Sequence, residues 1–519
     1  MGEALEEVNN QRAIVKLPQR NYTLKASSVA LGVLAILTLI AAVYYMRNFD
    51  VYIAVICALI GDAYVYLLAS GSSTRYERRH REPKNGLPVL LMVIGIVPLA
   101  VSIPLAFFGF LGTPFRAVLN TVIVVGFSIT FFFVSFSIPL GLRYAQLERH
   151  RKYDESYKPL VSILVPAFNE EKVISRTLET LVNLKYENKE IIVIDDGSTD
   201  KTFAISSWYR QFGVKVVRKP NGGKARALNY GLLFAKGELI VTVDADGMLP
   251  RNAVDEIVKL MSDKNVYAVS GNVKALNCNS VLTRCQQLEY ITAINTLRNS
   301  LDLFGAVIVV PGAFGAFRRE AIENTGYYDI DTVTEDFDLT LKVQKAYGSV
   351  AASTTAIAYT EVPATMKSLY RQRMRWIEGT YQTIAKHKDA FLNQGYGVLQ
   401  KIIYPLLLLS FIVPFATFSA LIASVILALN GGLLTLLMML GLFFMIQIFV
   451  VLMALSLDNS SYSLAAYSPL LVIGYRQFLD AITIIALVHF VFAGRSRKKL
   501  EWKRAERVGG VKPSIKVTA

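Results

Sequence analysis

Cysteine and histidine are scarce in this chain, which has three cysteines and four histidines among 519 residues. The cysteines (Cys57, Cys278 and Cys285) are odd in number and show no metal-ligand spacing, as expected of a reducing compartment. No histidine has a second histidine or a cysteine at ligand spacing. The pattern argues against a disulfide framework and a zinc site, so any metal should be a hard ion held by carboxylates.

The chain also lacks the two common phosphate-binding fingerprints. Its glycine-rich turn, Asn-Gly-Gly-Lys at 221–224, has neither the spacing of a P-loop nor that of a dinucleotide-binding motif. Kinase, ATPase and dehydrogenase functions therefore lose support. The net charge of +15 comes with basic clusters that lie beside apolar segments, which favours membrane flanks over nucleic-acid binding.

Long apolar segments are abundant, and 53% of the residues are hydrophobic. Each segment is near or above the ~20 residues that cross a bilayer core. A polar arm (1–27) without an A-x-A cleavage site precedes the first, so we expect no cleaved signal peptide. Four segments precede a polar block (28–46, 49–70, 87–112 and 115–142) and three follow it (402–430, 433–457 and 469–493).

Charge placement predicts the orientation of these segments. The basic loop 75–84 should face the cytoplasm, which places the polar block in the cytosol after four crossings. Three further full crossings would leave the basic tail 495–519 outside, against the same rule. Arg476 and Asp480 interrupt the last segment four residues apart and can pair across one helical turn. This segment is therefore expected to be re-entrant, interfacial or packed along a channel.

The polar block alternates short apolar runs with helical patterns, which is typical of βαβ units around a mostly parallel, buried sheet. Ligands bind such sheets beyond the carboxyl ends of the strands, where the polar segments 166–170, 195–198 and 244–246 fall. The expected strands are 161–165, 191–194, 214–217 and 239–243, and the expected helices are 170–184, 201–209, 224–235 and 251–261.

Asp244 and Asp246 flank an alanine directly after one of these strands. Residues two apart in an extended segment point to the same side, so both carboxylates can address one Mg²⁺ or Mn²⁺ that bridges to substrate phosphates. Surface turns also often carry two aspartates without binding a metal. The Asp195-Asp196 turn at an earlier strand end favours the metal interpretation.

Thr334, Glu335 and Asp336 open a helical pattern. Thr334 is a plausible N-cap, and the two acids would favour the helix dipole. Alternatively, a carboxylate at this position can accept the proton of an acceptor hydroxyl as a general base. Spacing alone leaves both interpretations open.

Gln372, Arg375 and Trp376 share one face of a predicted helix. The guanidinium suits a pyrophosphate and the indole suits the apolar face of a sugar ring. The alternative is a basic face of Arg371, Arg373 and Arg375 near lipid headgroups.

In this order, the motifs resemble those of membrane-integrated family 2 glycosyltransferases, among them cellulose, chitin, hyaluronan and poly-N-acetylglucosamine synthases. The resemblance covers about 159–379. It implies an α/β GT-A-like cytosolic domain, with a mostly parallel sheet that binds a nucleotide sugar, inserted between α-helical transmembrane segments. It further implies direct displacement with inversion at the anomeric carbon.

The resemblance also implies roles for individual residues. Asp336, with Glu335 beside it, resembles the catalytic base. Asp246 and Asp244 resemble the ligands for Mg²⁺ or Mn²⁺. Trp376 resembles the platform for the acceptor sugar. The residues that resemble nucleotide-sugar contacts are Asn169, Glu170, Asp195, Asp196, Lys224, Gln372 and Arg375.

The expected activity is transfer of a sugar, from UDP-N-acetylglucosamine, UDP-glucose or GDP-mannose, to a growing polysaccharide at the plasma membrane, processively and with coupled translocation. Transfer of one sugar to a membrane lipid is the alternative, because the apolar stretch 307–317 suits a lipid acceptor as well. A transporter or receptor without chemistry is a third hypothesis. The expected units are an arm (1–27), four spans (28–142), the transferase domain (143–379), interfacial helices (380–401), two or three spans (402–494) and a basic tail (495–519).

Overall fold

The computed structural model describes residues 153–391 and 393–492, together with positions 140, 141, 144, 147, 148 and 151. The expected arm, nearly all of the four expected N-terminal spans and the basic tail lie outside the described residues.

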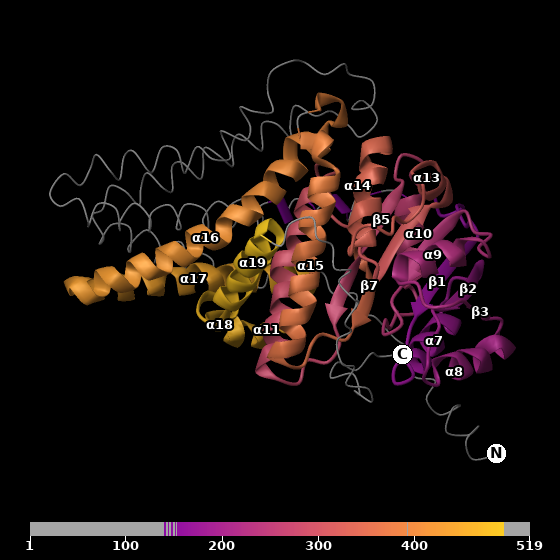
Figure 1. Ribbon diagram of the computed structural model, residues 1–519, viewed down its shortest axis with the longest axis horizontal. Coiled ribbons are helices and arrows are strands. Elements are labelled where there is room, and N and C mark those ends of the chain that lie inside the picture. The colour runs from indigo at the N-terminus through magenta and orange to yellow at the C-terminus, as the bar shows by residue number, and fades with distance from the viewer. Residues whose placement is uncertain are drawn as a thin grey trace, which may run out of the picture.

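Seven strands and the helices between them form the α/β domain (Figure 1). The strands are β1 Val161–Ala167, β2 Lys189–Asp195, β3 Lys215–Arg218, β4 Leu239–Val243, β5 Ala268–Ala275, β6 Phe314–Arg318 and β7 Val350–Thr360. The α-helices are α7 Ile174–Val182, α8 Thr202–Trp208, α9 Lys224–Leu232, α10 Ala253–Met261, α11 Val281–Glu289, α12 Leu297–Asp302, α13 Arg319–Asn324, α14 Glu335–Tyr347 and α15 Met366–Lys386, and a π-helix (Tyr290–Thr296) joins α11 to α12.

The strand order is β3-β2-β1-β4-β6-β5-β7. Pairing is parallel from β3 to β4 and between β5 and β7, whereas β6 runs antiparallel to both β4 and β5. The four expected strands are therefore confirmed, and the sheet is mixed. The sequence did not indicate β5, β6 or β7, because their alanine, glycine, serine and threonine residues form no continuous apolar run.

Both faces of the sheet are covered, which explains why β1, β2 and β4 are almost continuously apolar and buried. Helices α7 and α10 pack on one face, where Leu178 and Ile257 belong to the larger core cluster. Helices α9 and α14 pack on the other face, through Leu228 and Leu339. Since α9 and α14 both begin at the same edge of the sheet, their first residues can meet.

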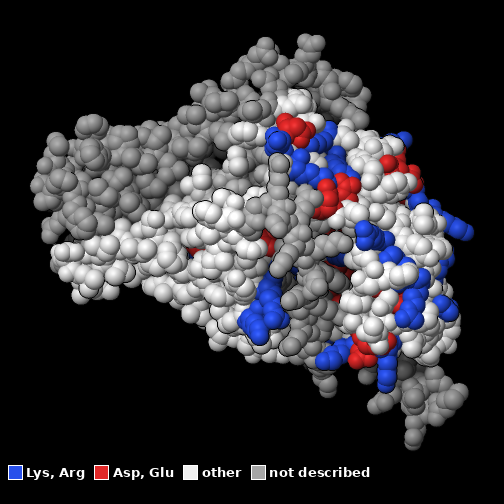
Figure 2. All heavy atoms as spheres, viewed as in Figure 1, with Lys and Arg blue, Asp and Glu red and all other residues white. Residues whose placement is uncertain are grey.

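The C-terminal helices α16 (Tyr404–Leu427), α17 (Leu433–Asp458), α18 (Ser468–Val472) and α19 (Tyr475–Phe492) lie beside the α/β domain, and α16 and α17 extend away from it (Figure 1). Among the described residues, two helices are long and apolar enough to cross a membrane, Leu399–Asn430 and Tyr475–Phe492. Lys and Arg gather over the α/β domain and are nearly absent from the extension (Figure 2).

The expected third C-terminal segment, 469–493, is not one continuous helix, because a turn at 473–474 separates α18 from α19. The predicted pairing within it is confirmed: Arg476 Nε lies 3.1 Å from Asp480 Oδ1. Thr417 of α16 donates to the other oxygen of Asp480 at 2.9 Å. Asp480 therefore joins α16 to α19.

Candidate active site

Lys224, the first residue of α9, contacts acidic side chains from two other elements. Its Nζ lies 2.6 Å from Asp244 Oδ1, just beyond β4, and 3.3 Å from Glu335 Oε1 at the start of α14. Burial by itself would lower the pKa of Lys224, but the charges of Asp244, Glu335 and Asp336 raise it above its ordinary value. The ammonium is therefore a permanent cation among three carboxylates.

Asp336 is fixed by backbone N–H groups. Its Oδ2 accepts a hydrogen bond from Gly312 N at 2.9 Å, and its Oδ1 accepts one from Phe337 N at 2.8 Å. A Cβ at position 312 would lie 2.5 Å from Lys224 Nζ and 3.5 Å from Asp336 Oδ2. A side chain at position 312 would therefore displace the Lys224 ammonium, so Gly312 belongs to the site, although the sequence did not indicate it individually.

Glu335 stands beside Asp336 with a side chain that is only 11% exposed. Burial raises the pKa of Glu335, Lys224 opposes this effect, and the neighbouring charge of Asp336 adds to it. Thr334 occupies the predicted N-cap position of α14, but its side chain makes no cap hydrogen bond. Its hydroxyl lies 3.2 Å from Thr383 Oγ1 in α15.

Asp244 and Asp246 lie in a turn, which Gly247 N closes by donating to Asp244 O at 2.8 Å. The extended geometry expected for this segment is therefore wrong, and the two carboxylates contact different groups. Asp244 meets Lys224, whereas Asp246 is 1% exposed and accepts from Thr360 Oγ1 at 2.9 Å. Asp246 thereby ties the end of β4 to the end of β7.

The donor set of this turn fits a hard divalent ion. Both side chains offer carboxylate oxygens, and Asp244 keeps 30% of its side chain exposed beside the cluster. Within the described part of the chain, no group of three or more His, Cys, Asp or Glu side chains is arranged to hold a metal. Mg²⁺ commonly takes only one or two protein carboxylates and completes its shell with substrate phosphates and water.

Asp196 organises the glycine-rich turn that leads into α9. Its carboxylate accepts from Gly223 N at 2.7 Å and from Gly222 N at 3.0 Å, and it pairs with Lys219 Nζ at 2.6 Å. Asp195 is fully buried, and its Oδ2 lies 3.0 Å from Arg218 Nε. Both aspartates hold the loop that sets the start of α9.

Asn169 and Glu170, at the end of β1, are joined to the loop after β2. Asn169 has a φ of 54°, and its side-chain oxygen accepts from Thr199 N at 2.8 Å. Glu170 is buried, and its backbone N donates to Thr202 Oγ1 at 2.6 Å. These contacts join the loop after β1 to the loop after β2, at the edge of the sheet where both strands end.

The predicted helix carrying Gln372, Arg375 and Trp376 is confirmed as the N-terminal half of α15. The side-chain oxygen of Gln372 is buried and has no hydrogen-bond partner among the residues that the structure describes. Trp376 packs against the larger core cluster, and Arg375 is half-buried. Within the described structure, no hydrogen bond or ion pair joins these three to Lys224 or Asp336.

Arg373 is buried, so the alternative of a basic face near lipid headgroups is wrong for this residue. Its Nη2 lies 2.8 Å from Glu289 Oε2, and Glu289 also accepts a hydrogen bond from the Tyr475 hydroxyl. The guanidinium lies 4.3 Å from the centroid of the Trp376 ring. The alternating arginines at 371, 373 and 375 do not predict that Arg373 is buried, because its burial depends on α11 and α19.

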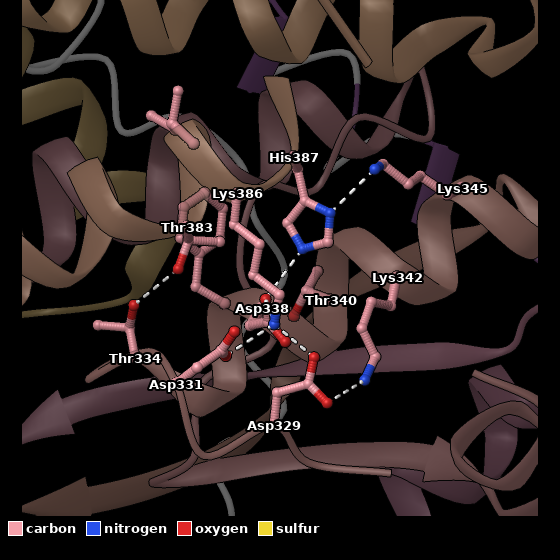
Figure 3. Close-up of polar contacts among 12 residues, drawn as sticks. Asp329, Asp331, Thr334, Asp338, Thr340, Lys342, Lys345, Thr383, Lys386 and His387 are labelled. Carbon is pink, nitrogen blue, oxygen red and sulfur yellow. Dashed lines mark hydrogen bonds and ion pairs between the residues drawn. The ribbon is translucent and has the colours of Figure 1, made fainter. Parts of the chain in front are cut away.

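The C-terminal half of α15 is fastened to α14 and to the segment that precedes Asp336 (Figure 3). Asp338 is fully buried and contacts Lys386 Nζ at 3.0 Å and His387 Nε2 at 2.9 Å. Lys386 also pairs with Asp329 and with Asp331. One helix thus carries Gln372–Trp376 at one end and fixes the acidic motif at the other.

The mixed sheet, with a lysine and carboxylates at the carboxyl ends of its parallel strands, is the GT-A-like architecture of nucleotide-sugar glycosyltransferases. A family model described as glycosyl transferase family 2 matches residues 162–326. The chain belongs to family 2 of the glycosyltransferases, and it is therefore a sugar transferase rather than a receptor or transporter without chemistry.

Two curated relatives are poly-beta-1,6-N-acetyl-D-glucosamine synthases. The chain is 30% identical over 290 residues to that of Staphylococcus aureus (strain COL), covering 54% of this chain and 69% of the relative. It is 31% identical over 229 residues to that of Staphylococcus epidermidis, covering 44% of this chain and 56% of the relative.

Among solved structures, the mannosyltransferase PcManGT from Pyrobaculum calidifontis, in complex with GDP-Man and Mn²⁺, superposes with a TM-score of 0.52 at 20% identity. The match covers 73% of this chain and 99% of that chain. It supports the GT-A-like fold.

Proposed function

We propose that this protein is a membrane-integrated, processive synthase that extends a polysaccharide from UDP-N-acetylglucosamine at the cytosolic membrane face and translocates it. The observation that carries the proposal is the Lys224 ammonium among Asp244, Glu335 and Asp336, at the strand ends of a family 2 domain. The names of the curated relatives favour N-acetylglucosamine over glucose and mannose.

In this proposal Asp336 is the general base. The acceptor hydroxyl oxygen forms a bond to the anomeric carbon, the bond from that carbon to the diphosphate breaks, and the hydroxyl proton passes to Asp336. The two backbone N–H groups on Asp336 hold its carboxylate in one orientation. Glu335 adds negative charge beside it.

Lys224, Gln372 and Arg375 are the proposed contacts to the donor diphosphate. A permanent ammonium and a planar guanidinium neutralise the negative charge that grows on a departing diphosphate. The glycine-rich turn that Asp196 organises lies on the proposed nucleotide-binding side of the site. Asn169, Glu170 and Asp195, at the ends of β1 and β2, lie on the same side.

Asp246, with Asp244, would hold the Mg²⁺ or Mn²⁺ that this chemistry uses. The bound ion lowers the free-energy cost of charge on the leaving diphosphate. The side chain of Asp246 is positioned by Thr360 at the end of β7, and that of Asp244 by Lys224.

Trp376 is the proposed platform for the acceptor sugar, because an indole face stacks on the apolar face of a pyranose. We further propose that α16, α17 and α19 belong to a multi-pass plasma-membrane region, with two or three C-terminal crossings and four N-terminal ones. The catalytic domain, 143–379, would then lie in the cytosol, with interfacial helices at 380–401 and a basic cytosolic tail at 495–519.

The product distinguishes this function from the addition of a single sugar to a lipid. Purified, detergent-solubilised protein is incubated with Mn²⁺ and labelled UDP-N-acetylglucosamine, UDP-glucose or GDP-mannose, and the product is sized before and after organic extraction. We expect a high-mass, water-soluble product from UDP-N-acetylglucosamine. A small, solvent-extractable product would contradict the proposal and establish lipid glycosylation.

A further inference from the structure

Arg373 is a buried cation in the middle of α15. Of the three arginines at 371, 373 and 375, it is the one that is buried. Burial by itself would lower the pKa of Arg373, but the charge of Glu289 raises it, so the guanidinium remains a cation. Hydrophobic residues can often replace a buried ion pair without loss of stability. Stability alone therefore does not explain this arginine.

Two other helices fix the Arg373 guanidinium. Its Nη2 lies 2.8 Å from Glu289 Oε2, and the Tyr475 hydroxyl donates to the same oxygen. Glu289 is the last residue of α11 and Tyr475 is the first residue of α19. Glu289 also stands where α11 passes into the π-helix Tyr290–Thr296, a rare conformation that is frequent at functional sites. The position of the guanidinium thus depends on both α11 and α19.

The guanidinium lies over the ring of Trp376. Its Cζ is 4.3 Å from the ring centroid, which is within the range of an attractive cation–π contact. Residues three apart are neighbours on a helix surface, so Arg373 and Trp376 meet without distortion of α15. Trp376 also packs against the larger core cluster. The indole therefore contacts both the core and a cation that is itself fixed.

We propose that Arg373 is a positioning residue for sugar transfer, which holds the Trp376 indole in the orientation that receives the acceptor sugar. Glu289 and Tyr475 in turn hold the guanidinium. This inference rests on the proposed function, in which Trp376 is the acceptor platform. An indole that turned freely would have to be ordered at each binding event and would place the acceptor hydroxyl less accurately. Water would then compete better with the acceptor for the donor sugar.

The test compares Arg373→Met with a matched control, Arg318→Met. Arg318 is also buried, lies 3.4 Å from Glu238 Oε1 and 6.0 Å from the Tyr267 ring centroid, and pairs with Leu239 at the start of β4. Both changes should lower Tm, since each removes a buried arginine and its hydrogen bonds. Arg373→Met should lower the ratio of sugar transferred to donor hydrolysed about tenfold and leave KM for UDP-N-acetylglucosamine within about twofold. Arg318→Met should leave both quantities unchanged.

Two double variants separate a positioning role from a stabilising one. Arg373→Met with Glu289→Gln leaves no buried charge unpaired, so Tm should recover while the ratio of transfer to hydrolysis stays about tenfold low. In a Trp376→Ala background, Arg373→Met should change this ratio little further, because it acts through the indole. Recovery of the ratio together with Tm, or independent effects of the substitutions at 373 and 376, would overturn the inference.

Fluorescence reports the position of the indole without any turnover. In a Trp208→Phe, Trp502→Phe background, Trp376 is the remaining tryptophan of the three in the chain. Arg373→Met should shift its emission maximum and Arg318→Met should not. An enzyme that transfers N-acetylglucosamine but whose emission and transfer ratio do not respond to Arg373→Met would contradict this inference alone. A wild-type enzyme that consumes no nucleotide sugar would contradict the proposed function and the inference with it.

Discussion

At the scale of single residues, the site depends on one ammonium set among three carboxylates. Lys224 contacts Asp244 and Glu335 and acts electrostatically on Asp336. Without a ligand the cluster keeps an excess of negative charge. Such an excess of negative charge suits a divalent ion. When the ion binds with a diphosphate, its charge would replace that of Lys224 beside the carboxylates, and Lys224 could then turn toward the phosphates.

Lys224→Met tests this balance, because it keeps the aliphatic stem and removes the ammonium. Donor turnover should fall at least about 100-fold. The free energy of unfolding should drop by roughly 3 kcal/mol, since three carboxylates lose their buried counter-charge. Steady-state assays and thermal unfolding measure the two effects.

The matched control is Lys259→Met, which breaks an exposed pair with Glu256. This change should alter stability by under about 0.5 kcal/mol and leave turnover unchanged. Wild-type turnover in Lys224→Met would contradict the role of Lys224.

Residue-level prediction from the sequence succeeded where a motif joins a strand end to a helix start. Lys224, Asp244 and Glu335 were each singled out, and the structure brings them into contact. Gly312 was not indicated individually, because Lys224 and Asp336 approach it only in the folded chain. Periodicity indicates which face of a helix is buried, but not which group lies opposite.

At the scale of elements, α15 couples two parts of the site. Its N-terminal half carries Gln372, Arg375 and Trp376, and its C-terminal half packs on the segment before Asp336. Val333 N donates to Gln382 Oε1 at 3.3 Å, and the Thr334–Thr383 contact joins the same two segments. A shift of α15 should therefore move Trp376, the proposed acceptor platform, together with Asp336, the proposed base.

Gly379→Ala should produce such a shift. A Cβ at this position would lie 2.5 Å from Thr334 Cγ2 and 2.8 Å from its Oγ1. We expect a loss of roughly 1–3 kcal/mol in stability, together with reduced transfer. Thermal unfolding and product formation measure both effects.

Adding Thr334→Ala provides the control, because it removes the two closest atoms and leaves the Cβ at 3.1 Å. The double variant should recover part of both losses. Wild-type behaviour of Gly379→Ala alone would show that α15 tolerates displacement at this contact.

Asp338→Ala tests the fastening of α14 to α15. It strips Lys386 and His387 of a fully buried partner, so stability should fall by about 3 kcal/mol in thermal unfolding. Glu323→Ala, which breaks an exposed pair with Arg319, should cost under about 0.5 kcal/mol. Equal effects of the two changes would contradict the account of this network.

Element prediction succeeded for β1, β2 and β4, because strands buried on both faces are almost continuously apolar. It also succeeded for the edge strand β3, whose Val216 and Val217 form a short apolar run. It failed for β7, in which Ser353, Thr354 and Thr355 interrupt the apolar pattern while Ala351 and Ala356 are buried. It also placed the start of α7 too early, at Glu170, because 170–173 form a turn in which Val173 N and Ile174 N donate to Glu170 O.

At the scale of the whole molecule, α15 packs on α19, which is a candidate membrane helix. Glu378 of α15 lies 2.8 Å from His489 Nδ1 of α19, and the Tyr381 hydroxyl donates to Thr483 O at 3.3 Å. Tyr475, the first residue of α19, shares Glu289 with Arg373. Anchoring of α19 in a bilayer would therefore position Trp376 at the membrane surface.

Cysteine labelling tests the proposed membrane region. In a background without the three native cysteines, Ile422→Cys in α16 and Trp208→Cys in the α/β domain are compared in membrane vesicles opened to the reagent. The native side chains are 50% and 60% exposed, respectively. A charged maleimide should label position 208 and spare position 422, because lipid excludes the reagent. Equal labelling would contradict a lipid-facing α16.

The most direct test of the catalytic assignment is sugar transfer by Asp336→Asn, measured with labelled donor alongside calorimetric titration of the same donor. Loss of the base should reduce transfer about 1,000-fold, while the Kd for the donor stays within about threefold because the ligating side chains remain. An asparagine variant that transfers sugar at the wild-type rate would contradict the assignment of Asp336 as the base.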